Sequence, residues 1–270
     1  MIPAQFDYIA AESAGHAIEL LAERGDDAKL LAGGHSLLPM MKLRLATPAL
    51  LVDIGGLDEL AGVSLDGDHL VIGATTRHGD LAASELARAE APLLAYAASQ
   101  VGDPQIRHRG TIGGSLSHAD PSADLPMALV ALGGSVVLQG PSGTRIVSAD
   151  DFFQGYFETE LAPDELLTAV RVPRRPGVPW GYQKFVRRAN DWAIVGVAAI
   201  DGRIALANMG PKPVRALAAE EALAAGASPA EAASLAADGT SPGEDFHADR
   251  EYRRHLARVL TRRALEHERG

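Results

Sequence analysis

Two pairs of adjacent glycines constrain this chain more than any other feature. The first pair lies in Ala32-Gly33-Gly34-His35-Ser36-Leu37, between a stretch that predicts a strand and one that predicts a helical turn. The second lies in Gly110-Thr111-Ile112-Gly113-Gly114-Ser115. Because glycine has no side chain, backbone N–H groups at such positions can close on an anion such as a pyrophosphate. Each segment alone is also compatible with a simple tight turn.

Charged residues flank the second glycine pair. Arg107, His108 and Arg109 precede it, and Asp120 and Asp124 follow it. A cation cluster beside a glycine loop suits a diphosphate, and a nearby carboxylate suits a ribityl or ribose hydroxyl, which needs an acceptor. The alternative is a surface turn whose charges are solvated.

Composition limits the classes of function. The chain has 270 residues, of which 47% are hydrophobic, so it can bury a sizeable core in one large or two modest domains. With 35 acidic and 25 basic residues, its net charge of -10 disfavours nucleic acid or an anionic membrane as the main partner. It has no cysteine, which excludes disulfides and Cys-ligated zinc or iron–sulfur clusters within this chain.

Hydropathy predicts no membrane span. The N-terminal segment MIPAQFDYIAAES has no basic start followed by an apolar block, so it does not resemble a signal peptide. No apolar run approaches the roughly 20 residues that a spanning helix needs. These features predict a cytoplasmic protein.

Hydrophobic periodicity predicts a compact α/β unit at the start of the chain. Ser13 is placed to cap a helix that ends near Gly25, and strands are expected at 29–32 and 50–54. Between 56 and 173, short strands alternate irregularly with helices; the clearest are strands at 69–74 and 135–138 and helices at 92–98 and 123–132. No G-x-G-x-x-G segment follows a strand, so a Rossmann fold is not expected.

A cluster of helix and strand breakers divides the chain. Pro173, Pro176, Gly177 and Pro179 lie close together and predict a linker. Beyond it, the dipeptide Asp201-Gly202 predicts a hairpin turn. The elements expected there are strands at 193–200 and 203–209, helices that start at 214 and 229, and a final helix at 248–267. The last part of the chain therefore predicts an antiparallel sheet with helices packed against it.

Three ordered segments resemble the flavin motifs of a known family. They are AGGHSLLPMMKLRL (32–45), IRHRGTIGGSLSHADPSADLP (106–126) and YQKFVRRANDWAIVGVA (182–198). In sequence, order and spacing they resemble the FAD-binding subunits of the xanthine dehydrogenase superfamily. MIPAQFDY, DELLTAVRVP and EYRRHLARVLTRRAL are similar to the medium subunit of carbon monoxide dehydrogenases in particular. The resemblance covers essentially the whole chain.

The resemblance implies an α+β fold with two domains. Residues 1–175 would form a two-lobed FAD-binding domain of the vanillyl-alcohol-oxidase (PCMH) type, with lobes at about 1–56 and 57–175 and the cofactor between them. Residues 176–270 would form a C-terminal antiparallel sheet-and-helix domain like that of the carbon monoxide dehydrogenase flavoprotein.

The resemblance also implies a set of cofactor-binding residues. Both glycine segments would hold the pyrophosphate, through Ala32, Gly33, Gly34, His35, Ser36 and Leu37, and through Thr111, Ile112, Gly113, Gly114 and Ser115. Many relatives have Asn in place of Ser115, which puts that one contact in doubt. Further contacts would come from Val101, Asp124, Leu167 and Lys184. Trp192 either stacks on the isoalloxazine ring or packs within a strand.

The implied activity is electron transfer. A molybdopterin-binding large subunit would oxidise the substrate, a 2Fe-2S small subunit would pass the electrons on, and FAD on this chain would deliver them to a quinone, NAD or oxygen. Two such three-subunit units would form a dimer. We expect no catalytic acid or base here. His35 and His118 are two lone histidines, so we expect no metal.

Two other functions stay open. The chain could be a stand-alone FAD-dependent oxidoreductase of the same superfamily, or a non-catalytic nucleotide-binding module that kept the fold and lost the cofactor. The substrate of the whole complex, whether carbon monoxide, a purine, an aldehyde or an N-heterocycle, would be selected on the large subunit.

Overall fold

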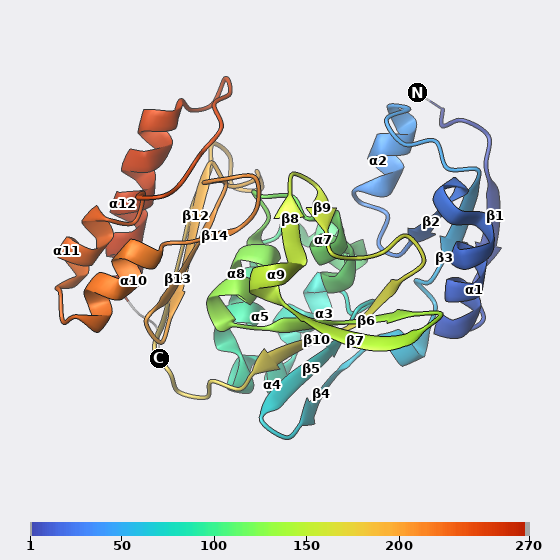
Figure 1. The fold of residues 1–270 in the computed structure, drawn as a ribbon, viewed down its shortest axis with the longest axis horizontal. Coiled ribbons are helices and arrows are strands. Elements are labelled where there is room, and N and C mark those ends of the chain that lie inside the picture. The colour runs from blue at the N-terminus through green and yellow to red at the C-terminus, as the bar shows by residue number, and fades with distance from the viewer. Residues whose placement is uncertain (1, 268–270) are drawn as a thin grey trace.

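The computed structural model describes residues 2–267; Met1 and residues 268–270, at the outer ends of the two predicted domains, lie outside it. The chain forms three successive parts, which run from right to left in Figure 1: a small N-terminal lobe, a central lobe and a C-terminal sheet with helices. Each part contains its own sheet.

The N-terminal lobe is a three-stranded parallel sheet of order β1-β3-β2. Its elements are β1 (Asp7–Ala10), α1 (Ala14–Arg24), the 3-10 turn η1 (Gly25–Asp27), β2 (Ala28–Leu31), α2 (Leu37–Lys42) and β3 (Leu50–Asp53). The side chain of Ser13 accepts a hydrogen bond from His16 N, so the predicted helix cap is confirmed. The first glycine pair connects β2 to α2.

The central lobe is a five-stranded antiparallel sheet of order β4-β5-β10-β6-β7. Its strands are β4 (Val63–Asp66), β5 (His69–Gly73), β6 (Ser135–Gly140), β7 (Gly143–Ser148) and β10 (Leu166–Pro173), with a separate pair, β8 (Phe153–Gly155) and β9 (Glu158–Thr159). Its helices are η2 (Asp58–Leu60), α3 (His78–Ala83), α4 (Glu85–Glu90), α5 (Pro92–Ser99), α6 (Pro104–Arg109), α7 (Ile112–His118), α8 (Asp124–Leu132) and α9 (Ala149–Phe152).

The C-terminal part is a four-stranded antiparallel sheet of order β11-β12-β13-β14. Its elements are β11 (Trp180–Phe185), β12 (Val195–Ile200), β13 (Arg203–Ala207), β14 (Val214–Arg215), α10 (Leu217–Ala224), α11 (Pro229–Ser234) and α12 (Arg250–Glu266). Ile200 pairs with Arg203, and both residues between them have positive φ, so the predicted hairpin at Asp201-Gly202 is confirmed.

The predicted ends of three elements were wrong by a few residues. The strand expected to reach 209 ends at Ala207, because Asn208 has a φ of 60° and turns the backbone out of the ladder. The strand expected from 193 begins at Val195. The helix expected from 214 begins at Leu217, because Val214–Arg215 pairs with β13 instead.

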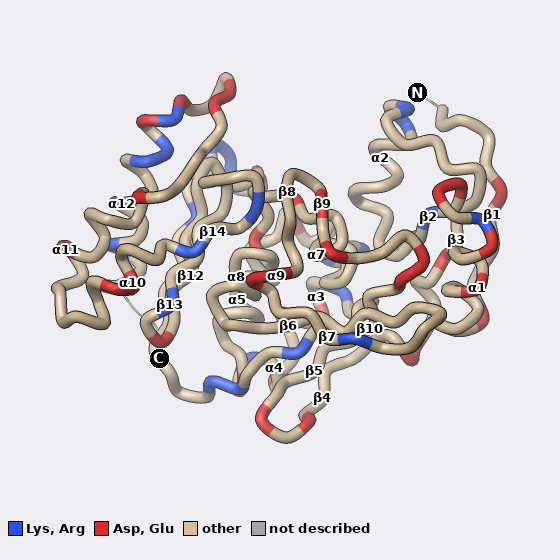
Figure 2. Tube along the Cα trace, viewed as in Figure 1, with Lys and Arg blue, Asp and Glu red and all other residues tan. Residues whose placement is uncertain are grey.

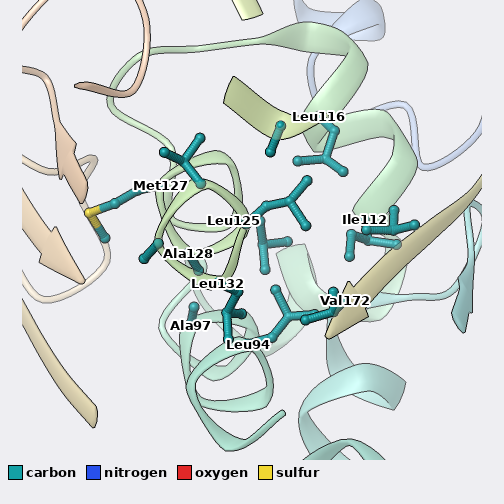
Figure 3. Packing of buried hydrophobic residues seen from close by; sticks show 14 of the residues in the cluster. Leu94, Ala97, Ile112, Leu116, Leu125, Met127, Ala128, Leu132 and Val172 are labelled. Carbon is teal, nitrogen blue, oxygen red and sulfur yellow. The ribbon is translucent and has the colours of Figure 1, made fainter. Parts of the chain in front are cut away.

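Helix α8 is the centre of the molecule, since all nine of its residues are buried. Figure 3 shows Leu125 facing Ile112 and Leu116 of α7, whereas Met127 points the other way, toward the C-terminal sheet. A Cβ atom on Gly196 of β12 would lie 3.1 Å from the sulfur of Met127, so helix and sheet are in close contact. One hydrophobic core therefore extends across the proline-rich connection and includes Trp180 and Tyr182.

Charged residues lie mostly on the outer loops and helices, as Figure 2 shows. The one charged residue of α8, Asp124, is at the start of the helix. Within residues 2–267, no helix combines the length and the apolar character that a bilayer crossing requires.

Truncation of Met127 tests the role of α8. Met127 is 1% exposed, so we expect Met127→Ala to leave a cavity between α8 and the C-terminal sheet and to lower the free energy of unfolding by about 2–5 kcal/mol. The measurement is urea denaturation followed by circular dichroism. Leu217→Ala, at a side chain 54% exposed, is the control and should change stability by less than about 0.5 kcal/mol. Equal effects at both sites would contradict this account.

Candidate functional site

The two glycine segments meet in space, although they come from different lobes. A Cβ atom on Gly33 would lie 2.8 Å from Cα of Gly110 and closer still to the carbonyl oxygen of Arg109. No side chain fits between these backbones, so the contact requires glycine at position 33. Gly34 has a φ of 76°, which also favours glycine. The structure thus brings the two predicted loops to one place, the junction of the lobes.

The second glycine pair forms the start of α7. The hydroxyl oxygen of Thr111 caps this helix by accepting a hydrogen bond from Gly114 N at 3.2 Å. Gly113 is buried, and its N–H donates to the carbonyl of Ala74 at 2.8 Å, while a Cβ on Gly113 would lie 2.6 Å from the Ala74 side chain. Gly114 is exposed and Ser115 is half-buried. The loop therefore packs against the end of β5 at Gly113, while its other side, at Gly114, is accessible.

Arg77 joins the two lobes next to the loops. Its guanidinium donates hydrogen bonds to the carbonyl oxygens of Gly55, in the N-terminal lobe, and Arg109, in the central lobe. Partial burial and the nearby Arg109 side chain lower the pKa of Arg77. The backbone of Arg77 also forms a β-bridge with Thr111. Arg77 therefore ties the second loop to the N-terminal lobe at Gly55, and no motif in the sequence singled it out.

His78 lies directly beneath the second loop. A Cβ on Gly110 would lie 2.7 Å from the imidazole Cδ2 atom, so the ring fills the space that a side chain there would need. His78 is 4% exposed, and its Nδ1 atom has no hydrogen-bond partner among residues 2–267. Burial lowers its pKa to about 4, and the charges of His35, Arg107 and Arg77 act in the same direction. The ring is therefore neutral at physiological pH.

A second group of predicted residues gathers where α8 meets β11. The ammonium group of Lys184 lies 2.9 Å from Oδ2 of Asp124 and donates to the carbonyl of Gln100 at 3.1 Å. The hydroxyl of Tyr182 donates to Oδ1 of Asp124. Burial raises the pKa of Asp124, and Lys184 and Tyr182 oppose that shift. Within the part of the chain that the structure describes, Lys184 makes two hydrogen bonds, which leaves the third hydrogen of its ammonium group for a ligand.

The three other predicted cofactor contacts lie in different parts of the fold. Val101 follows Gln100, and its carbonyl accepts a hydrogen bond from Arg107 at 3.0 Å. Leu167 is buried in the central core at a β-bulge of β10. Trp192 is 56% exposed on the loop between β11 and β12.

The two histidines of the motifs have separate surroundings. His35 is exposed, and the ring of His118 packs against Phe157 at 5.1 Å. Within residues 2–267 we find no group of three His, Asp or Glu side chains arranged to hold a metal ion.

Two backbone loops closed on each other at a lobe junction, with side chains excluded, are suited to hold a dinucleotide pyrophosphate. Comparison with known families defines the class. Residues 4–175 match the model of the FAD binding domain in molybdopterin dehydrogenase, and residues 180–267 match that of the CO dehydrogenase flavoprotein C-terminal domain. The chain therefore belongs to the FAD-binding flavoprotein family of the molybdopterin dehydrogenases. The predicted fold class, cofactor and oxidoreductase class are confirmed.

Individual relatives are similar over nearly the whole chain. The carbon monoxide dehydrogenase medium chain of Hydrogenophaga pseudoflava is 43% identical, covering 98% of this chain and 97% of its own length. The 6-hydroxypseudooxynicotine dehydrogenase complex subunit alpha of Paenarthrobacter nicotinovorans is 38% identical, covering 98% and 95%. A solved structure of the Hydrogenophaga pseudoflava carbon monoxide dehydrogenase, in a form that lacks the Mo-pyranopterin moiety, superposes with a TM-score of 0.94 at 45% identity, covering 98% of each chain.

The low pKa of His78 predicts an acid-dependent loss of stability. Because the unfolded chain protonates this histidine first, its contribution is complete above pH 6.5 and is lost as the pH falls toward 4, by up to about 3 kcal/mol. His78→Leu should flatten that part of the curve of unfolding free energy against pH. Leu217→Ala, at an exposed residue that does not titrate, is the control and should keep the slope of the curve. An unaltered slope in His78→Leu would refute the assignment.

Proposed function

We propose that this chain is the electron-transfer subunit of a molybdenum hydroxylase complex, in which FAD receives electrons from a 2Fe-2S small subunit and passes them to an external acceptor. The observation that carries the proposal is the side-chain-free contact of Gly33 with Arg109 and Gly110, which suits a pyrophosphate at the lobe junction. The names of the relatives, which are medium chains and complex subunits, support the assignment to a complex.

The proposed roles divide between the two groups of residues. The backbone N–H groups of 32–37 hold the pyrophosphate from the first loop, and the hydroxyl hydrogen of Thr111, which is free to donate, binds it from the second. The N–H groups of 112–115 already donate to protein oxygens, so these residues contact the cofactor through their other atoms. The remaining donor of Lys184 reaches the flavin, and Asp124 holds the Lys184 side chain in place. Val101 and Leu167 line the site, and Trp192 stacks on the isoalloxazine ring. FAD itself supplies the redox chemistry.

The proposed partners follow from what this chain lacks. It has no cysteine, so it offers no thiolate ligands for an iron–sulfur cluster. By the resemblance to the xanthine dehydrogenase superfamily, we assign the clusters to a small subunit and the molybdopterin to a large subunit. A quinone, NAD or oxygen accepts the electrons. Carbon monoxide is the substrate that the similarity to the Hydrogenophaga pseudoflava medium chain favours. We place the domain boundary near residue 175, with lobes at 1–56 and 57–175, and the site of action in the cytoplasm.

Substitution of Gly33 tests the pyrophosphate cradle. The Cβ of Gly33→Ala would clash with the backbone at 109–110, so the loops must separate, and a cost of about 1.4 kcal/mol already weakens FAD binding about tenfold. The measurement is fluorescence titration of the FAD-free chain. The control is Gly56→Ala, because that position is exposed and no atom of the described residues lies within 4 Å of the added Cβ. Equal affinity in both variants would contradict the cradle.

The visible spectrum separates the proposed function from its alternatives. The purified chain loaded with FAD should show flavin bands at about 370 and 450 nm. Carbon monoxide should bleach the longer-wavelength band only after assembly with the large and small subunits. Substrate turnover by the single chain would favour a stand-alone oxidoreductase, and a chain that cannot be loaded would favour a non-catalytic module.

A further inference from the structure

The loop that carries Trp192 has a fixed base. Its ends are joined by a hydrogen bond from Ile194 N to the carbonyl of Phe185 at 2.8 Å. The two carbonyls that follow the indole are held by side chains from elsewhere in the fold: Asn208 Nδ2 donates to Ala193 O at 2.8 Å, and Arg253 donates to Ile194 O. A surface loop with an exposed indole is thus anchored immediately beside that indole.

Asn208 adopts a conformation that only a few residue types tolerate. Its φ of 60° is left-handed, which costs most side chains free energy but is accessible to asparagine. The turn ends β13 and aims the amide at the Trp192 loop. At the same time the backbone N–H of Asn208 donates to the carbonyl of Pro121 at 2.7 Å. The side chain and the backbone N–H of Asn208 therefore each form a hydrogen bond with another segment.

Pro121 belongs to the turn between α7 and α8. This turn follows the C-terminal end of α7, the helix that the second glycine segment begins, and leads into Asp124. Asn208 consequently links the turn that leads into Asp124 to the loop that carries Trp192. A displacement of either segment would have to break a hydrogen bond of Asn208.

Arg253 supports the same loop from the opposite side. It is 2% exposed on α12, and its second guanidinium nitrogen lies 2.7 Å from Asp245 Oδ2. Asp245 in turn accepts hydrogen bonds from the backbone of His247 and Ala248. The loop base is therefore held between α12 and the end of β13.

We propose that Asn208 is a positioning residue, which holds the Trp192 loop at a set distance from the α7–α8 turn so that the indole lies against the flavin ring. This inference rests on the proposed function, since it assumes bound FAD. Trp192 has 56% of its surface exposed although its loop is anchored, which suits an aromatic surface reserved for a ring of the cofactor. Asn208 binds the carbonyl of Ala193, the residue after Trp192, so it acts on the flavin through Trp192.

Flavin fluorescence in the FAD-loaded chain tests the proposal, because an indole stacked on the ring quenches it. Asn208→Gly removes the amide and keeps the backbone free to adopt positive φ. Loss of one such hydrogen bond shifts a local equilibrium by about three- to tenfold, so we expect bound FAD to fluoresce several-fold more strongly. Trp192→Leu should give an equal or larger rise. In the double variant, Asn208→Gly should add nothing further, which a merely structural role would not produce.

Asp201→Gly is the matched control. Asp201 also has positive φ, at 50°, and lies in the turn at the other end of β13, away from the Trp192 loop. It should leave the fluorescence of bound FAD unchanged.

Each outcome decides one part of the proposal. If Trp192→Leu raises the fluorescence and Asn208→Gly does not, the positioning role is overturned. If neither variant changes it, the stacking of Trp192 is also overturned, although the FAD-binding proposal stands. If the chain binds no FAD at all, the proposed function fails together with this inference.

Discussion

The buried ion pair between Asp124 and Lys184 is the interaction on which the rest of the site depends. The two side chains are 3% and 9% exposed, and they join the first residue of α8 to β11. Removal of one partner from such a pair typically costs about 3–5 kcal/mol, because the other charge stays buried without compensation. The hydroxyl of Tyr182 and the carbonyl of Gln100 complete the hydrogen bonding. The pair therefore fixes the C-terminal sheet on the central lobe.

A steric constraint acts at the other junction, between the N-terminal and central lobes. The backbone at Gly33 approaches the backbone at Gly110 so closely that no Cβ fits, and His78 occupies the space under Gly110. Arg77 then spans the two lobes with hydrogen bonds to carbonyl oxygens on both sides. Close backbone contact and a bridging guanidinium together leave little freedom in the spacing of the two loops. The affinity for a ligand held by both loops would depend on that spacing.

Local sequence signals predicted many of the elements. The Ser13 cap, the hairpin at Asp201-Gly202 and the buried helix at the centre were found because turn chemistry and periodicity act over a few residues. The predictions failed at Val214 and Asn208, where pairing with β13 and contacts to distant segments set the ends of the elements. The assignment to a family came from resemblance, since glycine pairs alone do not distinguish a pyrophosphate site from a turn.

The sequence by itself determined which residues can come close together: two glycine pairs without side chains, one acid at the start of an entirely apolar helix, and no cysteine to hold a cluster. Only the tertiary structure decided which of them meet. Arg77, His78 and Asn208 belong to no motif, and they matter because the fold places carbonyls of distant segments, or a side-chain-free backbone, next to them. Every residue has a backbone carbonyl that can accept a hydrogen bond, whatever its side chain. No local sequence pattern therefore shows which carbonyl a distant side chain will reach.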